Sequence, residues 1–108
     1  MALRWNDLPA DVLAVLRKGA VIPAHPLALD ASRKFDARRQ RALSRYYIDA
    51  GSGGLAVGVH TTQFAIREKG LYEPVLSLAM NAAREWTKRP LVMIAGLAGR
   101  TAQAVKEA

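Results

Sequence analysis

The sequence GLAVGVHTTQF, residues 54–64, joins a short apolar run to a group of small polar side chains. The apolar run, residues 55–59, shows no alternation with polar residues, which is typical of a parallel strand covered on both faces. Parallel α/β sheets bind their ligands beyond the carboxyl ends of their strands. We therefore expect a strand here and a binding site at His60, Thr61 and Thr62, where that strand ends.

Two further apolar runs flank this stretch. Residues 20–22 stop at Pro23 and lead into a loop that carries His25, and residues 91–95 are again continuously apolar. We expect both runs to be short buried strands. His25 then stands at a strand end, as His60 does, so we include it among the candidate substrate-binding residues.

Helical patterns occupy the segments around these strands. Apolar residues at helical spacing predict a helix that begins near Asn6-Asp7 and stops before Gly19. The other predicted helices cover residues 35–50, 68–88 and 102–108. Strands that alternate with helices form a parallel sheet with right-handed crossovers. We expect an α/β fold in which an N-terminal helix (1–18) precedes three parallel β-α units (19–108).

The predicted helix over residues 35–50 has an apolar side and a basic side. The apolar side, which we expect to be buried, comprises Phe35, Ala42, Leu43, Tyr46 and Ala50. The basic side comprises Arg38, Arg41 and Arg45, and we interpret it as solvated.

Composition narrows the function classes. The formal net charge is +7, which suits an acidic partner, so a basic module that binds anions or nucleic acid is one alternative. The chain lacks cysteine, which excludes disulfides and thiolate chemistry and agrees with a cytoplasmic location. No run approaches the roughly 20 apolar residues of a membrane span, so we expect no membrane partner. Two histidines without a nearby carboxylate do not predict a metal site.

Three apolar parallel strands need neighbours on both sheet edges and helices on both faces. A chain of 108 residues with this pattern offers too few strands to supply them. We therefore expect the sequence to be the front part of a longer chain.

Taken in order, these segments resemble the N-terminal part of the dihydrodipicolinate synthase and N-acetylneuraminate lyase family, from about residue 19 to residue 106. The likeness is carried by Pro23-Ala24-His25-Pro26, by residues 46–55, and by Ile94-Ala95-Gly96 with the following Gly99-Arg100-Thr101. The resemblance implies a (β/α)8 TIM barrel and a class I aldolase or lyase. Such an enzyme joins pyruvate or another 2-oxo acid to an aldehyde, or cleaves the product, through a Schiff base. It also implies a homo-oligomer and no metal or organic cofactor.

The same resemblance assigns a role to the strand exit. The family typically ends this strand in Gly-Thr-Thr-Gly-Glu, and a gapless alignment places His60 and Thr61 on the two threonines. A shift of one residue would place Thr61 and Thr62 there instead, so Thr61 belongs to the motif in both registers. In the family this turn receives the substrate carboxylate. Gln63 stands where the family has glutamate, and His25 stands where it usually has threonine.

The family's Schiff-base lysine and catalytic tyrosine lie on later strands. The resemblance therefore implies no catalytic residue in this segment, and the 108 residues alone are expected to be inactive. A non-catalytic fragment or paralogue that folds by pairing with other copies is a further alternative.

Overall fold

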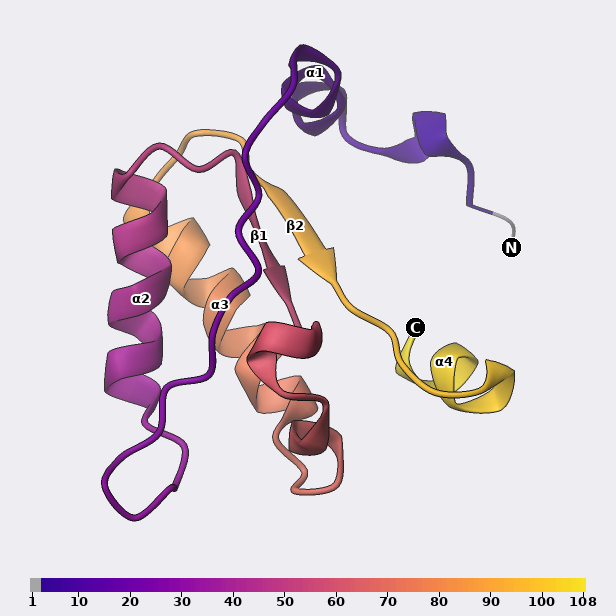
Figure 1. Ribbon diagram of the computed structural model, residues 1–108. Helices are drawn as coiled ribbons and strands as arrows, with labels where there is room; N and C mark the ends of the chain where they lie inside the picture. The colour runs from indigo at the N-terminus through magenta and orange to yellow at the C-terminus, as the bar shows by residue number, and fades with distance from the viewer. Residues whose placement is uncertain (1–2) are drawn as a thin grey trace.

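The computed structural model describes residues 3–108, and in it α2 and α3 pack on the same side of a small sheet (Figure 1). The helices are α1 (Ala10–Lys18), α2 (Ala37–Asp49), α3 (Tyr72–Trp86) and α4 (Thr101–Glu107), and the strands are β1 (Gly54–Val57) and β2 (Val92–Ala95). Short 3₁₀ helices cover Trp5–Asp7 (η1), His60–Thr62 (η2) and Phe64–Arg67 (η3).

The sheet of the described residues 3–108 has two parallel strands, not three. Gly54 of β1 lies opposite Val92 of β2, and Val57 lies opposite Ala95. The prediction of three parallel β-α units that begin a (β/α)8 TIM barrel is therefore wrong. The structure is a small α/β arrangement with one two-stranded sheet.

The segment that was expected to be the first strand runs beside β1 as extended chain. The Ala56 N–H donates to the Pro23 carbonyl (3.0 Å), and the His25 N–H donates to the Ala56 carbonyl (2.8 Å). Only one isolated parallel bridge forms, at Ala24. Pro23 has no N–H and Pro26 follows closely, so a regular ladder cannot continue here.

The N-terminal helix begins later than predicted. Leu8 is extended, with φ −61° and ψ 144°, because the residue before a proline disfavours the helical conformation. The helix α1 therefore begins after Pro9, and its bounds are Ala10–Lys18. Residues 1–2 of the predicted N-terminal segment lie outside the described residues.

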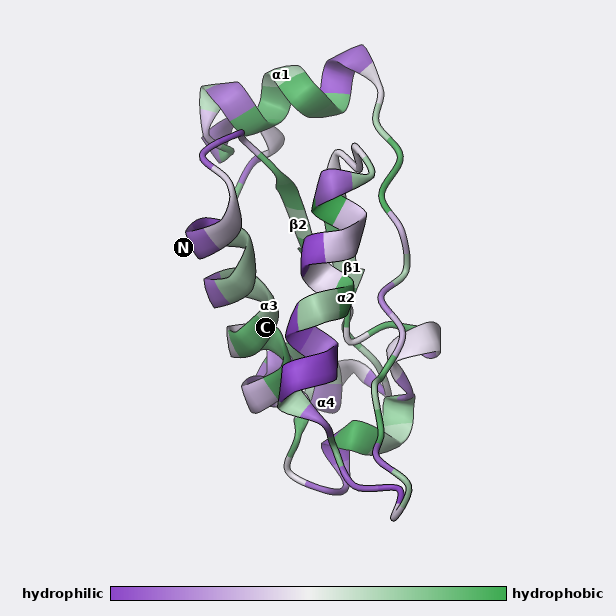
Figure 2. Ribbon diagram, turned by 90° about the vertical axis from the view of Figure 1, so that its left-hand side faces the viewer, coloured by the Kyte–Doolittle hydropathy of each residue, from purple (hydrophilic) through white to green (hydrophobic). Residues whose placement is uncertain are grey.

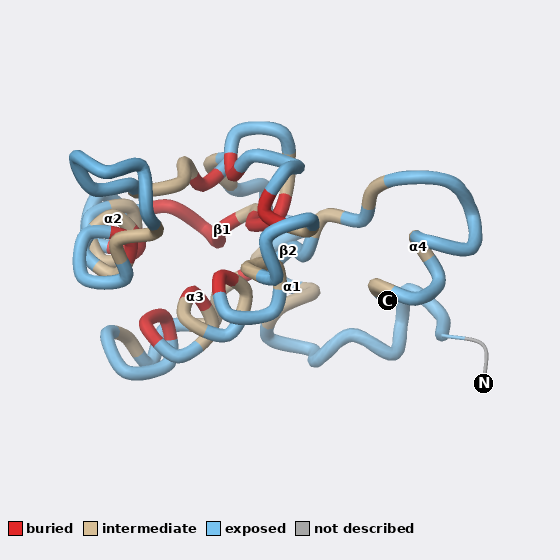
Figure 3. Tube along the Cα trace, turned by 90° about the horizontal axis from the view of Figure 1, so that it is seen from below, coloured by how far each residue is buried: buried red, intermediate tan, exposed pale blue. Residues whose placement is uncertain are grey.

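The hydrophobic core lies between the sheet and α3. Its buried members are Leu55, Val57, Ile66, Val75 and Ala79. Figure 3 shows buried residues along β1 and on the facing sides of α2 and α3, whereas the segments of α1 and α4 show none. The packed body therefore consists of the sheet, α2, α3 and the turn between β1 and α3.

The buried face of α2 differs from the predicted one. Its buried residues are Gln40, Ser44 and Ile48, whereas Tyr46, from the side expected to be buried, is 66% exposed. Figure 2 shows hydrophilic residues over the side of α2 that faces away from the sheet. The basic side is not wholly solvated either, since the Arg45 guanidinium lies over the Trp86 ring of α3, 4.6 Å from its centre.

The turn between α3 and β2 is tied to the end of α2 by Arg89. Its guanidinium donates to the carbonyls of Ile48 (2.9 Å) and Ser52 (2.7 Å). The Trp86 indole N–H donates to the Asp49 carboxylate in the same region (2.8 Å). These bonds join the end of α2 and the residues before β1 to the turn that precedes β2. Across residues 3–108, every helix is too short or too polar to cross a bilayer.

Candidate functional site

The chain leaves β1 through a tight turn that contains the predicted motif. Gly58 and Gln63 both adopt left-handed backbone conformations, with φ of 76° and 75°, on either side of η2. Glycine accepts this conformation without strain, but for glutamine it is strained. Strained residues of this kind cluster at binding sites, so the turn is a candidate site on backbone grounds as well.

Thr62 closes the turn from inside the protein. It is fully buried, and its hydroxyl donates to the His25 carbonyl (2.6 Å) and accepts from the Gly58 N–H (3.1 Å). Its polar groups therefore tie the exit of β1 to the extended segment beside it. The hydroxyl therefore both donates and accepts within the protein.

His25 is also fully buried, in a polar network with α2. Its Nδ1 lies 2.6 Å from the Pro26 carbonyl, so Nδ1 carries the hydrogen, because a carbonyl only accepts. Nε2 then accepts from the Ser44 hydroxyl (2.8 Å). Gln40 donates to the Pro26 carbonyl (3.1 Å) and accepts from the Ala28 N–H (2.6 Å). Burial lowers the pKa of His25, which favours this neutral ring.

His60 and Thr61 are the exposed members of the motif. The His60 ring is tilted against the Phe64 ring at 5.5 Å between centres, and within residues 3–108 neither His60 nor Thr61 forms a side-chain hydrogen bond. Their N–H groups open η2, where a helix has no internal acceptor for its first donors. The structure thus divides the predicted residues into a buried pair, His25 and Thr62, and an exposed pair, His60 and Thr61.

Arg67 is the residue that sequence reasoning missed. One terminal nitrogen of its guanidinium, Nη2, donates to the carbonyls of Gly58 and Gly96, at 2.9 Å each. These glycines directly follow β1 and β2, so Arg67 joins the carboxyl ends of both strands. Its Nε donates to the Glu107 carboxylate of α4, and the two side chains are 11% and 6% exposed. The only sequence signal was a lone arginine shortly after the strand exit.

Aromatic rings and two clefts surround Arg67. Its guanidinium lies 4.3 Å from the centre of the Tyr72 ring and 5.5 Å from that of Phe64, and the Tyr72 hydroxyl donates to the Gly96 carbonyl. A cleft of about 400 Å³ lies between Arg67, Tyr72 and α4, and another of about 390 Å³ lies between Phe64, Arg67 and Gly99. Arg67 therefore lines both clefts at the carboxyl end of the sheet.

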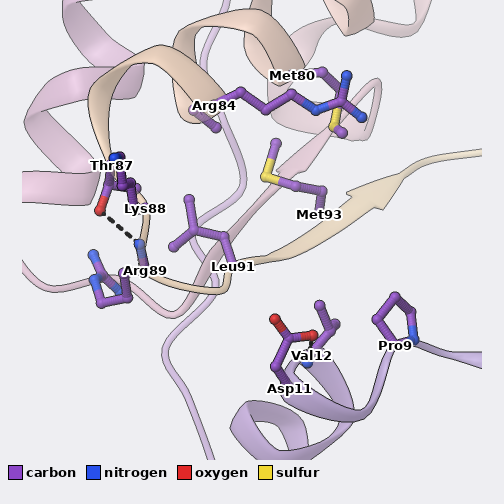
Figure 4. Close-up of a pocket in the computed structure, with 11 residues that line it drawn as sticks. Pro9, Asp11, Val12, Met80, Arg84, Thr87, Lys88, Arg89, Leu91 and Met93 are labelled. Carbon is purple, nitrogen blue, oxygen red and sulfur yellow. Dashed lines mark hydrogen bonds between the residues drawn. The ribbon is translucent and has the colours of Figure 1, made fainter.

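A further cleft, of about 530 Å³, lies at the opposite end of the sheet. Figure 4 shows it between Pro9 and Val12 of the α1 region, Leu91 just before β2 and Met93 within it, and Arg84 near the end of α3. Ligands of parallel sheets bind at the carboxyl ends of the strands, and none of the predicted site residues lines this cleft. We therefore place the candidate site at the exit of β1.

No group of three or more His, Asp or Glu side chains in the described part of the chain could hold a metal ion. Comparisons with protein-family models, with curated proteins and with solved structures found no match.

Proposed function

We propose that this chain supplies the carboxylate-binding turn of a class I aldolase or lyase that acts on pyruvate or another 2-oxo acid. The observation that carries the proposal is the exposed residue Thr61 at the carboxyl end of β1, in a turn with a strained Gln63. The resemblance of residues 54–64 to the carboxylate-binding turn of the dihydrodipicolinate synthase and N-acetylneuraminate lyase family gives that turn its substrate class.

Each group of the turn has a part in this chemistry. The Thr61 hydroxyl and the N–H groups that open η2 donate to the substrate carboxylate, since oriented backbone donors favour an anion. Holding the carboxylate fixes the neighbouring keto carbon for attack by an amine, a gain in proximity and orientation. The exposed His60 imidazole stands beside the same carboxylate.

The amine itself comes from outside these residues in our proposal. Every lysine of the chain is exposed, and none follows a strand. An amine that forms a Schiff base is usually desolvated or close to another cation, which lowers its pKa. The proposal therefore includes a longer enzyme, a homo-oligomer in the cytoplasm, and the lack of cysteine agrees with a reducing compartment.

Trapping with borohydride tests the reaction class. The protein encoded by the whole reading frame that contains this sequence is incubated with pyruvate and sodium borohydride and weighed by mass spectrometry. We expect one reduced pyruvate adduct per subunit, attached to a lysine, and no adduct when pyruvate is left out. An unchanged mass after treatment with pyruvate would refute the Schiff-base mechanism.

The substitution Thr61→Val tests the role of the turn. Loss of a hydrogen bond to a charged group costs about 1.5–3 kcal/mol, so half-saturation of the trapping reaction should need roughly tenfold more pyruvate or higher. Thr87→Val, at the opposite end of the sheet, is the matched control and should leave half-saturation unchanged. If both variants reach half-saturation at the same pyruvate concentration, Thr61 does not bind the substrate carboxylate.

A further inference from the structure

Arg67 already holds a carboxylate at the carboxyl end of the sheet, and that carboxylate belongs to the chain itself. The Glu107 carboxylate accepts a hydrogen bond from the Arg67 Nε. This hydrogen bond lowers the pKa of Glu107 below its ordinary value, so the carboxylate is charged at neutral pH. The second Glu107 contact is with the Ala98 N–H (3.4 Å). The end of α4 therefore lies at the same sheet edge as the exits of β1 and β2.

Little besides Glu107 holds α4 in place. No residue of α4 is buried as a whole and Val105 is 69% exposed, although the Glu107 side chain itself is only 6% exposed. Figure 3 shows α4 beside the packed body, without buried residues of its own. A helix of 7 residues is not stable in water without tertiary contacts. The position of α4 thus depends largely on one carboxylate.

Arg67, in contrast, is held independently of Glu107. The carbonyls of Gly58 and Gly96 and the ring of Tyr72 fix its guanidinium. Its second terminal nitrogen, Nη1, is buried and has no hydrogen-bond partner among the described residues. The guanidinium therefore stays in position, and keeps an unused donor, when the Glu107 carboxylate leaves.

We propose that Arg67 is a binding site for a small carboxylic acid anion and that Glu107 is its internal, exchangeable occupant. The ligand carboxylate replaces that of Glu107 at Nε, and α4 detaches from the sheet edge. Arginine pairs with carboxylates through strong charge-assisted hydrogen bonds, and the clefts on both sides of Arg67 give a ligand room to enter. The site uses Arg67, not Thr61, so it does not depend on the proposed aldolase chemistry.

The test compares two variants that remove the same charge. Glu107→Gln removes the internal occupant, whereas Glu85→Gln removes an exposed carboxylate on α3. The ¹⁵N-labelled chain is titrated with sodium succinate, with sodium chloride of equal ionic strength as the reference, and the arginine Nε–H signals are followed by NMR. Loss of one signal in Arg67→Lys assigns that signal to Arg67.

Succinate should shift the Arg67 signal at a concentration at least tenfold lower in Glu107→Gln than in Glu85→Gln, because the competing carboxylate is gone. Saturating succinate should also move the amide signals of α4 in the unsubstituted chain toward their positions in Glu107→Gln. Equal succinate affinity in the two variants would overturn the proposal and leave a purely structural ion pair. If Arg67→Lys fails to fold, the Arg67 Nε–H signal is assigned instead through bonds from the Arg67 backbone amide, and the comparison of the two glutamate variants is unchanged. Thr61→Val should not alter the succinate response.

Discussion

At the scale of single residues, His25 gives the clearest link between structure and a measurable property. The hydrogen bonds to Pro26 and Ser44 suit a neutral ring, and burial lowers its pKa from the ordinary value of 6.5. An unfolded chain releases this histidine to water, where it takes up a proton more readily than in the native state. The free energy of unfolding is therefore coupled to the protonation of His25.

We predict that the chain loses stability as the pH falls. Above the unfolded-state pKa of about 6.5 both states are neutral, and the network contributes fully. Below it, the unfolded state binds a proton that the native state does not, so the free energy of unfolding drops by up to about 1.4 kcal/mol per pH unit. The drop ends at the lowered native-state pKa. Urea unfolding between pH 7.5 and 5 measures it.

His25→Gln and His60→Gln form the matched pair for this measurement. His60→Gln makes the same replacement at the exposed histidine and is the reference for the effect of the substitution itself. His25→Gln should flatten the dependence between pH 7.5 and 5 and lower stability at every pH, because it disturbs the contacts of Ser44 and Pro26. A steep dependence retained in His25→Gln would show that another group is responsible.

The sequence predicted only part of the candidate site. The motif placed His60, Thr61 and Thr62 at the exit of β1, and the structure places them in η2 at that exit. The sequence contained nothing to show which threonine turns inward, because a one-residue difference in a tight turn reverses the direction of a side chain. Arg67 was missed because its partners are two backbone carbonyls and a carboxylate 40 residues away, which no local sequence pattern identifies.

At the scale of elements, the pairing of β1 with β2 depends on Gly54. A Cβ atom at this position would lie 1.8 Å from the Val92 carbonyl oxygen, which is far inside van der Waals contact. The obstacle is backbone of the paired strand, which no rotamer change relieves. Gly54→Ala should therefore separate the strands or distort the ladder, and should lower the free energy of unfolding by about 3 kcal/mol or more.

Gly70→Ala is the control for the general effect of replacing a glycine. Gly70 has φ of 67°, and a Cβ there would meet no atom within 4 Å. Its replacement carries backbone strain alone, about 1 kcal/mol. Chemical unfolding of both variants separates the steric effect from that strain. If the two variants lose equal stability, the close approach of Gly54 to Val92 is not what limits the pairing.

Local patterns predicted most elements well, since their signals lie within the elements themselves. The expected helices over residues 35–50 and 68–88 contain α2 and α3, and the expected strand over residues 91–95 contains β2. The side chain of Asp36 caps α2 by accepting from the Arg39 N–H (3.0 Å). The prediction of a first strand over residues 20–22 was wrong, because apolar residues do not form a regular hydrogen-bonded ladder where prolines remove backbone N–H donors.

The buried face of α2 was predicted wrongly for a different reason. Hydrophobic periodicity assigns polar residues to solvent, but Gln40 and Ser44 are buried because partners far along the chain satisfy their hydrogen bonds. A buried polar group is tolerated when it is paired. That pairing depends on His25 and Pro26, which only the tertiary structure brings to α2.

At the scale of the whole molecule, the chain consists of a packed body and two peripheral helices. The body holds the buried residues of β1, α2 and α3, whereas no residue of α1 or α4 is buried (Figure 3). Stability within a protein is not uniform, and segments with few buried contacts open with little free energy. The body and the periphery should therefore respond differently to the same conditions.

Hydrogen exchange followed residue by residue by NMR measures this difference. Amides of β1, α2 and α3 should exchange only through openings that cost most of the free energy of unfolding, whereas those of α1 and α4 should be at least a hundredfold less protected. Glu107→Gln should lower the protection of α4 further and leave α1 unchanged, since only α4 depends on the Arg67 contact. Protection of α4 equal to that of α3 would contradict this division. Buried packing, which residues 101–107 lack, would then have to hold the helix.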